Sequence, residues 1–111
     1  MSFEFTDEHL AILVLLEVAR EETTTGIMKL LQEGYDRTKL SALKASRNTV
    51  DKWLTHLTYN DLVELKPDRK YCLTEAGQAR IEQERQDKFT SRTAGLFKEL
   101  FEELTATKVS N

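Results

Sequence analysis

The stretch that decides the fold is residues 46–74, SRNTVDKWLTHLTYNDLVELKPDRKYCLT. Its first half predicts an amphipathic helix over residues 47–59, capped by the hydroxyl of Ser46. Asn60 is expected to end this helix in the left-handed conformation, which asparagine tolerates. At about 100° per residue the helix has two opposite stripes. The apolar stripe is Val50, Trp53, Leu54 and Leu57, and the polar stripe is Asn48, Lys52, Thr55 and Tyr59.

The second half of the stretch predicts a small β-hairpin. Residues 62–65 and 70–73 are short, apolar-rich segments, and each has the length of a strand. Pro67 and Asp68 between them suit the middle of a type I turn. Thr74 can then cap a further helix that begins at the next residue. The expected order is therefore helix, strand, turn, strand and capped helix.

Upstream of this stretch the sequence predicts three helices. Residues 36–44 are expected to form a short helix, joined so tightly to the next helix that the pair has the helix-turn-helix pattern. A loop over residues 21–25 precedes another short helix over 26–33, which Gly34 ends. The first helix, from Asp7 to about Arg20, is apolar on nearly every side. It is expected to be a central buried helix or part of a subunit interface.

Downstream, residues 75–111 are expected to be helical and amphipathic, with a bend or break over residues 90–95. The fold class is therefore mainly α with a small two-stranded β-hairpin and amphipathic N- and C-terminal helices. We expect residues 1–80 to form the main domain and residues 81–111 a helical extension that serves dimerisation. A 12.8 kDa chain has little core to cover both terminal helices alone, although the last helix could also fold back on its own domain.

The charge is unevenly distributed along the chain. The formal net charge is −3, and residues 1–35 carry seven acidic and two basic residues. Residues 36–70 carry five acidic and eight basic residues, so the basic excess lies in this one block. A localised basic block is compatible with a nucleic-acid partner despite overall acidity.

The polar residues of the decisive stretch suit contacts with duplex DNA. Asparagine can pair with the adenine edge, and arginine can pair with guanine or a phosphate. Lysines and arginine at a hairpin tip can contact phosphates beside the helix. An ordinary solvent-exposed helix face would carry similar polar residues, so the assignment of these residues to DNA binding is a hypothesis. The candidate DNA-binding residues are Ser46, Arg47, Asn48, Thr49, Lys52, Thr55, Tyr59, Lys66, Arg69 and Lys70.

A family resemblance covers roughly residues 38–80. SRNTV at 46–50, followed by Leu54, Leu57 and DLVE at 61–64, resembles the recognition helix and wing entry of winged helix-turn-helix regulators. YCLTEAG at 71–77 looks like their wing exit, and the MarR-like and PadR-like groups are nearest. The chain departs from the family in having Asn60-Asp61 where glycine is usual, and a short wing, which favours phosphate contact over deep minor-groove insertion.

The resemblance implies a winged helix and a homodimeric transcriptional regulator that binds double-stranded DNA. A dimer would place two recognition helices about 34 Å apart on a palindromic site. The alternative function is a winged-helix protein-interaction module without DNA binding.

Other function classes find little support in the sequence. No glycine-rich phosphate loop or nucleophile–base set is present, so an enzyme is not expected. One cysteine and two histidines make no convincing zinc set, and neither a metal nor a cofactor is expected. We expect no membrane partner and a cytoplasmic location. A small-molecule effector is compatible with a cleft between the terminal helices, but no set of residues points to one.

Overall fold

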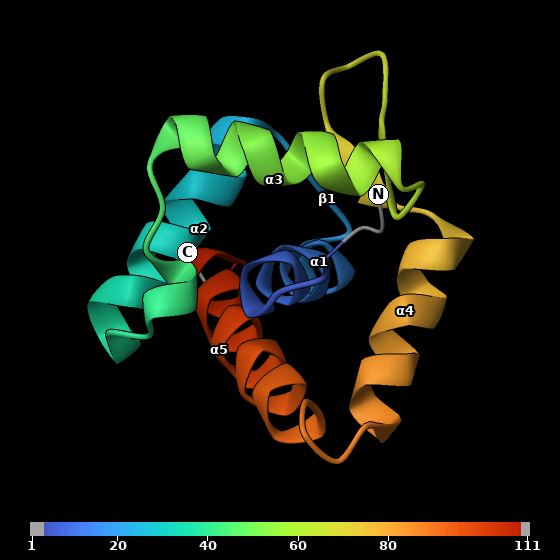
Figure 1. Cartoon of the computed structure of the whole chain (residues 1–111). Coiled ribbons are helices and arrows are strands. Elements are labelled where there is room, and N and C mark those ends of the chain that lie inside the picture. The colour runs from blue at the N-terminus through green and yellow to red at the C-terminus, as the bar shows by residue number, and fades with distance from the viewer. Residues whose placement is uncertain (1–3, 110–111) are drawn as a thin grey trace.

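The computed structural model describes residues 4–109, and the side chains of residues 4–106. Within that range the chain is mainly helical, with five α-helices and an antiparallel sheet of strand order β1-β3-β2. Figure 1 shows α1 end-on in the middle of the molecule, with the other helices around it. The elements are α1 (Asp7–Ala19), β1 (Glu21–Glu22), α2 (Thr24–Thr38), the 3₁₀ turn η1 (Ser41–Leu43), α3 (Arg47–Tyr59), β2 (Val63–Leu65), β3 (Tyr71–Leu73), α4 (Glu75–Gln86) and α5 (Ser91–Val109).

The apolar first helix is the centre of the core. This agrees with the first of the two expectations from the sequence, a central buried helix. The seven consecutive residues from Leu10 to Leu16 are each 1% exposed or less. Helix α5 packs along α1 and contributes Phe97 and Phe101, which are also fully buried. The two terminal helices therefore pair within one chain. Covering α1 needs no second subunit.

The C-terminal segment shares this core. The break between its helices comes earlier than the expected residues 90–95, because residues 87–90 separate α4 from α5. The carboxylate of Asp87 accepts a hydrogen bond from the backbone N–H of Phe89 at 2.8 Å, which favours a turn over a further helical turn. The boundary expected at residue 80 falls inside α4, and α5 packs on α1.

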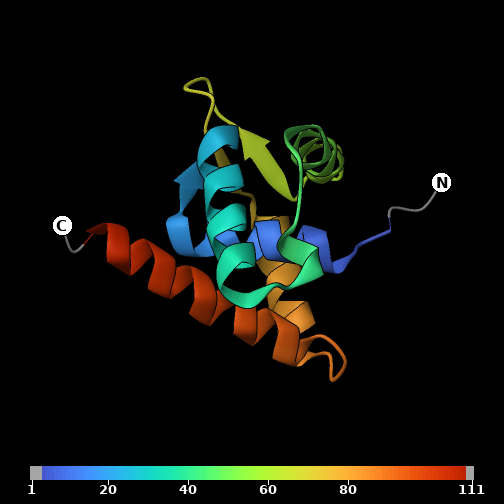
Figure 2. The ribbon, with the colours of Figure 1, turned by 90° about the vertical axis from the view of Figure 1, so that its left-hand side faces the viewer.

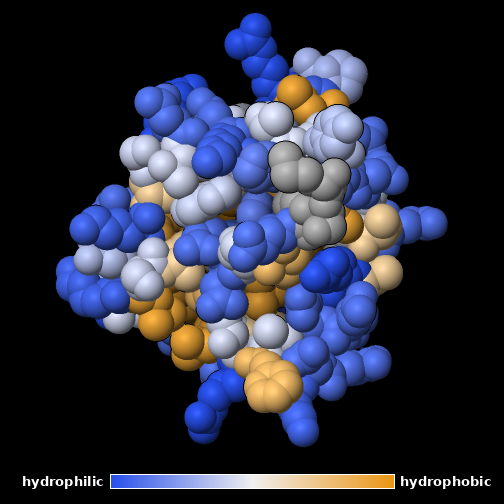
Figure 3. All heavy atoms as spheres, in the orientation of Figure 1, coloured by the Kyte–Doolittle hydropathy of each residue, from blue (hydrophilic) through white to orange (hydrophobic). Residues whose placement is uncertain are grey.

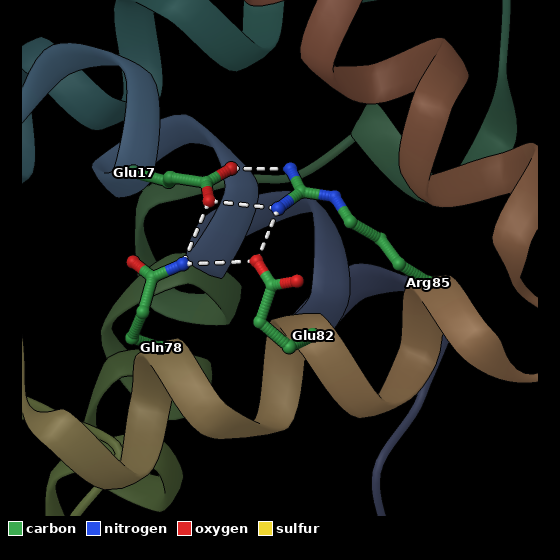
Figure 4. A network of polar contacts seen from close by, with 4 residues as sticks. All are labelled: Glu17, Gln78, Glu82 and Arg85. Carbon is green, nitrogen blue, oxygen red and sulfur yellow. Dashed lines mark hydrogen bonds and ion pairs between the residues drawn. The ribbon is translucent and has the colours of Figure 1, made fainter.

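A polar network holds α4 against α1 (Figure 4). Arg85 of α4 donates to the carboxylate of Glu17 in α1 and also to Glu82, the latter at 2.9 Å. Gln78 donates to the same Glu17 carboxylate at 2.8 Å. The hydrogen bond from Arg85 is the main cause that lowers the pKa of Glu17 below its usual value. This network links α4 directly to the central helix α1.

Helix α2 is longer than the helix predicted over residues 26–33, because Gly34 does not end it. Gly34 is buried, and a Cβ atom there would lie 3.0 Å from the side chain of Leu100 and 3.1 Å from that of Leu43. Glycine at this position therefore permits the close approach of α2 and α5. The left-handed residue that ends α2 is Lys39, with φ of 59°.

The prediction of a separate helix over residues 36–44 is wrong. Its first residues belong to α2, and η1 is the short turn that follows. The hydroxyl of Thr38 accepts from the backbone N–H of Leu40 at 3.2 Å, which closes the end of α2. Leu43 of η1 is fully buried, so this turn anchors the chain directly before α3.

The predicted hairpin is present, but the sheet has three strands instead of two. β2 pairs with β3, and the N–H of Arg69 donates to the carbonyl of Lys66 at 2.9 Å across the predicted turn. The third strand, β1, lies in the segment expected to be the loop 21–25, and Glu21 is registered opposite Cys72. Two extended residues are too few for an alternating pattern to identify a strand.

The two predicted caps around the hairpin are confirmed. The hydroxyl of Ser46 accepts from the N–H of Thr49 at 3.3 Å at the start of α3. The hydroxyl of Thr74 accepts from the N–H of Gly77 at 3.0 Å at the start of α4. These caps fix where α3 begins and where the chain leaves the sheet.

Polar residues cover most of the face shown in Figure 3, and hydrophobic residues appear there in smaller patches. Among the described residues, no helix has both the length and the apolar character needed to cross a membrane.

A buried histidine lies at the start of α1, facing α3. The Nδ1 atom of His9 accepts from the backbone N–H of Thr6 at 3.2 Å, and its ring lies 5.7 Å from that of His56 in α3. Burial, together with the smaller effect of His56, lowers the pKa of His9 from 6.5 to about 4, and Glu8 opposes both. Protonation of this ring therefore acts against the packing of α3 on α1.

Acidification from pH 7 to pH 5 is expected to lower the free energy of unfolding by about 2 kcal/mol through His9. The unfolded chain takes up this proton near pH 6.5, whereas the folded chain does so only near pH 4. The contribution is thus complete above pH 6.5 and is lost as the pH falls. Urea titrations at both pH values measure it. His9→Gln should remove most of the loss and His56→Gln should retain most of it, whereas equal losses in wild type and His9→Gln contradict this account.

Candidate nucleic-acid interface

Helix α3 has the two faces predicted from its sequence. Its inner residues Val50, Leu54 and Leu57 are fully buried in the core. The outward stripe of Asn48, Lys52, Thr55 and Tyr59 is exposed, and Tyr59 is 89% exposed. The exposed stripe is thus held on a helix whose other face cannot rotate out of the core.

The candidate residues on α3 differ in how far their polar groups are already engaged. The Ser46 hydroxyl caps the helix, and the hydroxyl of Thr55 donates to the carbonyl of Asp51 at 2.8 Å. The side chains of Arg47, Asn48 and Lys52 form no hydrogen bond or ion pair with any described residue. These three side chains can therefore meet a ligand without breaking an internal contact. The hydroxyl of Thr49, a further candidate residue, lies 3.0 Å from that of Ser46 and is therefore also engaged within the chain.

At the hairpin, two of the three basic residues are paired with an acid. The Nζ atom of Lys66 lies 2.7 Å from the Glu21 carboxylate, and that of Lys70 lies 3.5 Å from it. The hydrogen bond between Lys66 and Glu21 lowers the pKa of the carboxyl group and raises the pKa of the amine. Arg69 is exposed and has no ion pair with any described residue. It is the hairpin cation most available to a partner.

A shallow hollow brings the start of α3 and the hairpin tip together. It has a volume of about 380 Å³ and contains both Arg47 and Arg69. The start of α2 forms a third wall. The lining residues are Thr23, Thr24, Thr25, Arg47, Leu65, Arg69 and Tyr71. Two guanidinium groups and several hydroxyls around one hollow can hold an anionic group such as a phosphate.

Sequence reasoning did not identify the threonines of this hollow or the acid beside the hairpin. Residues 23–25 were expected to be loop, whereas Thr23 caps α2 by accepting from the N–H of Gly26 at 3.1 Å. The run of three threonines before a glycine is a local capping signal that could have revealed the helix start. The place of Glu21 depends on the pairing of β1 with β3, a contact between distant segments that no local pattern indicates.

No group of three or more metal-ligating side chains is clustered in the part of the chain that the structure describes. Comparison of the chain with protein-family models, curated proteins and solved structures finds no match.

Proposed function

We propose that this chain is a winged helix-turn-helix protein that binds double-stranded DNA in a sequence-specific way, with α3 in the major groove and the hairpin on the backbone. The observation that carries the proposal is the junction of Arg47 and Arg69 at one hollow beside the exposed polar face of α3. A helix that reads bases and an adjacent site for a phosphate are the two components that such recognition needs.

The size of α3 fits the major groove. An α-helix with its side chains is about 10–12 Å across, and the groove is about 12 Å wide. The 13 residues of α3 are about 20 Å long. With the first turn of the helix in the groove, Asn48 can reach a base edge and Lys52 lies one turn later. Tyr59 then lies beyond the groove wall, where its hydroxyl can contact a phosphate.

The hollow at Arg47 and Arg69 suits a backbone phosphate beside that groove. An arginine fork binds phosphate oxygens in a bidentate manner, and the threonine hydroxyls can donate as well. Helix α3 and the hairpin tip lie at the same end of the molecule, with α5 along the opposite side (Figure 2). One duplex can therefore contact both elements.

A regulatory role is part of the proposal, since a protein that occupies a DNA site can control what else binds there. A homodimer is also part of the family resemblance. The sequence argument for a homodimer was that a second subunit is needed to bury α1. That argument does not hold, because α1 is buried within a single chain.

The second candidate function is a protein-interaction module. Glu21 neutralises part of the hairpin charge, and the chain as a whole is acidic. Both features weaken attraction to DNA. A stoichiometric protein partner together with no affinity for duplex DNA would favour this function.

Asn48→Ala and Lys52→Ala are expected to affect DNA binding in different ways. The asparagine contacts a base edge in the proposed complex, so its loss should change the ranking of sites, at a cost of about 1–3 kcal/mol for the preferred site. The lysine contacts phosphate, so its loss should weaken all sequences about equally. Binding-site selection from random duplexes with each variant provides the measurement. An unchanged ranking with Asn48→Ala would show that this residue reads no base.

Glu21→Gln is expected to strengthen DNA binding about two- to fivefold at low salt, since it releases Lys66 and Lys70 for phosphate contacts. Glu64→Gln on β2 is the matched control, because this exposed acid also lies on the sheet and makes no ion pair with a described residue. Fluorescence anisotropy with one duplex compares the two variants. If Glu21→Gln gains no more than Glu64→Gln, the two lysines do not contact DNA.

A further inference from the structure

A groove runs along α5 where the end of α2 packs on it. The two helices are in contact, and Figure 2 shows the end of α2 against the middle of α5. A hollow of about 520 Å³ lies there, and its lining includes Arg37 of α2 and Leu96, Leu100 and Ala106 of α5. A second shallow hollow, of about 650 Å³, shares Leu96 with the first and extends to Ser91. Together the two hollows follow α5 for about 22 Å.

Leu96 is the apolar residue at which the two hollows meet. It is 44% exposed, whereas Leu100, one turn further along α5, is 4% exposed and lies deeper in the first hollow. Beside Leu96, a Cβ atom on Gly95 would meet nothing within 4 Å, so space is open there. An apolar side chain placed next to Leu96 would shield both side chains from water, which is favourable.

Acidic side chains line the same groove. Glu99, Glu102 and Glu103 border the first hollow, and all three are exposed. Glu103 forms an ion pair with Arg37 of α2 at 3.5 Å. The carboxylates of Glu99 and Glu102 form no ion pair or hydrogen bond with any described residue. We call the surface formed by these three glutamates, Arg37 and Leu96 the acidic groove.

We propose that the acidic groove binds a cationic amphipathic helix of a partner protein, with an apolar side chain beside Leu96 and lysine or arginine side chains at Glu99 and Glu102. The groove has three glutamates and one arginine, so its net charge is −2. This proposal does not depend on DNA binding. It adds a partner on another surface and does not replace the DNA.

The charge of the acidic groove selects among the classes of partner. Phosphate groups of a nucleic acid or of an anionic membrane would lie against like charges, which is repulsive. A second copy that placed the same groove against this one would bring three glutamates against three glutamates. A cationic segment gains two ion pairs, because Glu99 and Glu102 have no competing cation among the described residues.

The shape of the acidic groove favours a helical segment over an extended one. Its walls are helices, whose backbone groups are already paired within each helix, so the groove offers no strand edge to an extended segment. A helix satisfies its own backbone and makes contact through side chains three or four residues apart. A length of about 22 Å corresponds to about four helical turns. One apolar face flanked by cations therefore matches both the leucine and the glutamates.

The position of the acidic groove has a consequence for DNA that rests on the proposed function. Helix α5 lies on the opposite side of the molecule from α3 and the hairpin tip (Figure 2). A partner helix in the groove and a duplex on α3 therefore occupy different surfaces. The chain can then hold both at once and bring the partner protein to the DNA site.

A labelled synthetic peptide tests the acidic groove on the full chain. The probe is an amphipathic helix of about 15 residues, with leucines on one face and lysines on both flanks. A second peptide, with glutamates in place of the lysines, is its charge control. Fluorescence anisotropy at low salt should show that the chain binds the lysine peptide at least about tenfold more tightly than the glutamate peptide.

Substitutions in the acidic groove should change the affinity for the lysine peptide in both directions. Glu99→Gln combined with Glu102→Gln should weaken binding about three- to tenfold, and Leu96→Gln should weaken it about threefold or more. Arg37→Gln should strengthen binding about twofold, because it removes the cation that competes for Glu103. Circular dichroism confirms that each variant is folded.

Asp51→Asn combined with Glu64→Gln is the matched control for the glutamate pair. It removes the same charge from two exposed acids of α3 and β2 that form no ion pair with a described residue. It should weaken peptide binding less than about twofold. Equal effects of the two double variants overturn the proposal, and so does a lysine peptide that fails to bind or that binds Leu96→Gln as tightly as wild type.

Duplex DNA is titrated separately, so that the two proposals fail independently. With saturating duplex present, the affinity for the lysine peptide should stay within about threefold of its value without DNA. Peptide binding by a chain without DNA affinity supports the acidic groove and contradicts only the proposed function. DNA binding by a chain that does not bind the peptide contradicts only the acidic groove.

Discussion

Arg47→Glu is expected to lower the affinity for duplex DNA about 100-fold at 50 mM salt, or about 2.7 kcal/mol. The substitution removes a cation from the hollow that it shares with Arg69 and places an anion against the DNA backbone. The fold should be unaffected, because Arg47 is exposed at the first position of α3 and an acid in the first turn suits the helix dipole. Anisotropy titration gives the affinity, and thermal unfolding gives the stability.

Lys98→Glu is the matched control for this prediction. It changes the net charge by the same amount, but its exposed side chain lies on α5, on the side of the molecule away from α3. It should weaken binding less than about threefold, through the overall field alone. Equal effects of the two variants would mean that only net charge matters and that α3 is not the contact surface.

Gly77→Ala is expected to destabilise the fold by about 3 kcal/mol or more. A Cβ atom on Gly77 would lie 2.0 Å from the carbonyl oxygen of Leu62 and 3.3 Å from the side chain of Leu73. The first of these is a backbone atom at the entry to β2, so it cannot move aside as a flexible side chain would. Helix α4 would have to shift away from the sheet and break the hydrogen bond from the Thr74 hydroxyl to the Asp61 carbonyl.

The control for Gly77→Ala is the same change at Gly95, which also lies within a helix. A Cβ atom there meets nothing within 4 Å, so alanine should stabilise the chain by about 0.5–1 kcal/mol through its better helix propensity. Urea unfolding measures both variants. A Gly77→Ala protein as stable as wild type would show that α4 does not pack this closely on the hairpin.

The stretch from α3 to the start of α4 could be predicted because its determinants are local. Ser46 and Thr74 cap the helices that follow them, and Pro67 precedes a turn closed by a backbone hydrogen bond. Each of these signals acts over a few residues. The spacing of buried and exposed residues on α3 follows from helix geometry in the same way.

Even within this stretch, one local prediction is wrong. Asn60 has φ of −93° and is not left-handed, whereas Asp61 has φ of 61°. The side-chain amide of Asn60 donates to the carbonyl of His56 at 2.8 Å, which closes the last turn of α3 and moves the left-handed residue one position along. Asparagine and aspartate both tolerate that conformation, so their order in the sequence does not decide between them.

The features that the sequence did not predict depend on contacts between distant segments. Gly34 was expected to end a helix, as glycine often does, but it packs against Leu100 of α5 and lies inside α2. The apolar α1 was compatible with a buried helix or a subunit interface, and only the position of α5 decides between them. The pairing of Glu21 with Lys66 likewise requires β1 to lie beside β3, and it changes which hairpin cation is available to a partner.

The salt dependence of binding to a duplex tests the central claim most directly. The account predicts binding at 50 mM salt, with a plot of log affinity against log salt that has a slope of about −2.7 or steeper, since Arg47, Arg69 and Lys52 each contact a phosphate. The variant Arg47→Glu should have a slope that is shallower by about one contact. No binding to any duplex at 50 mM salt, under conditions where the chain is folded, would contradict the proposal that α3 and the hairpin form a DNA-binding surface.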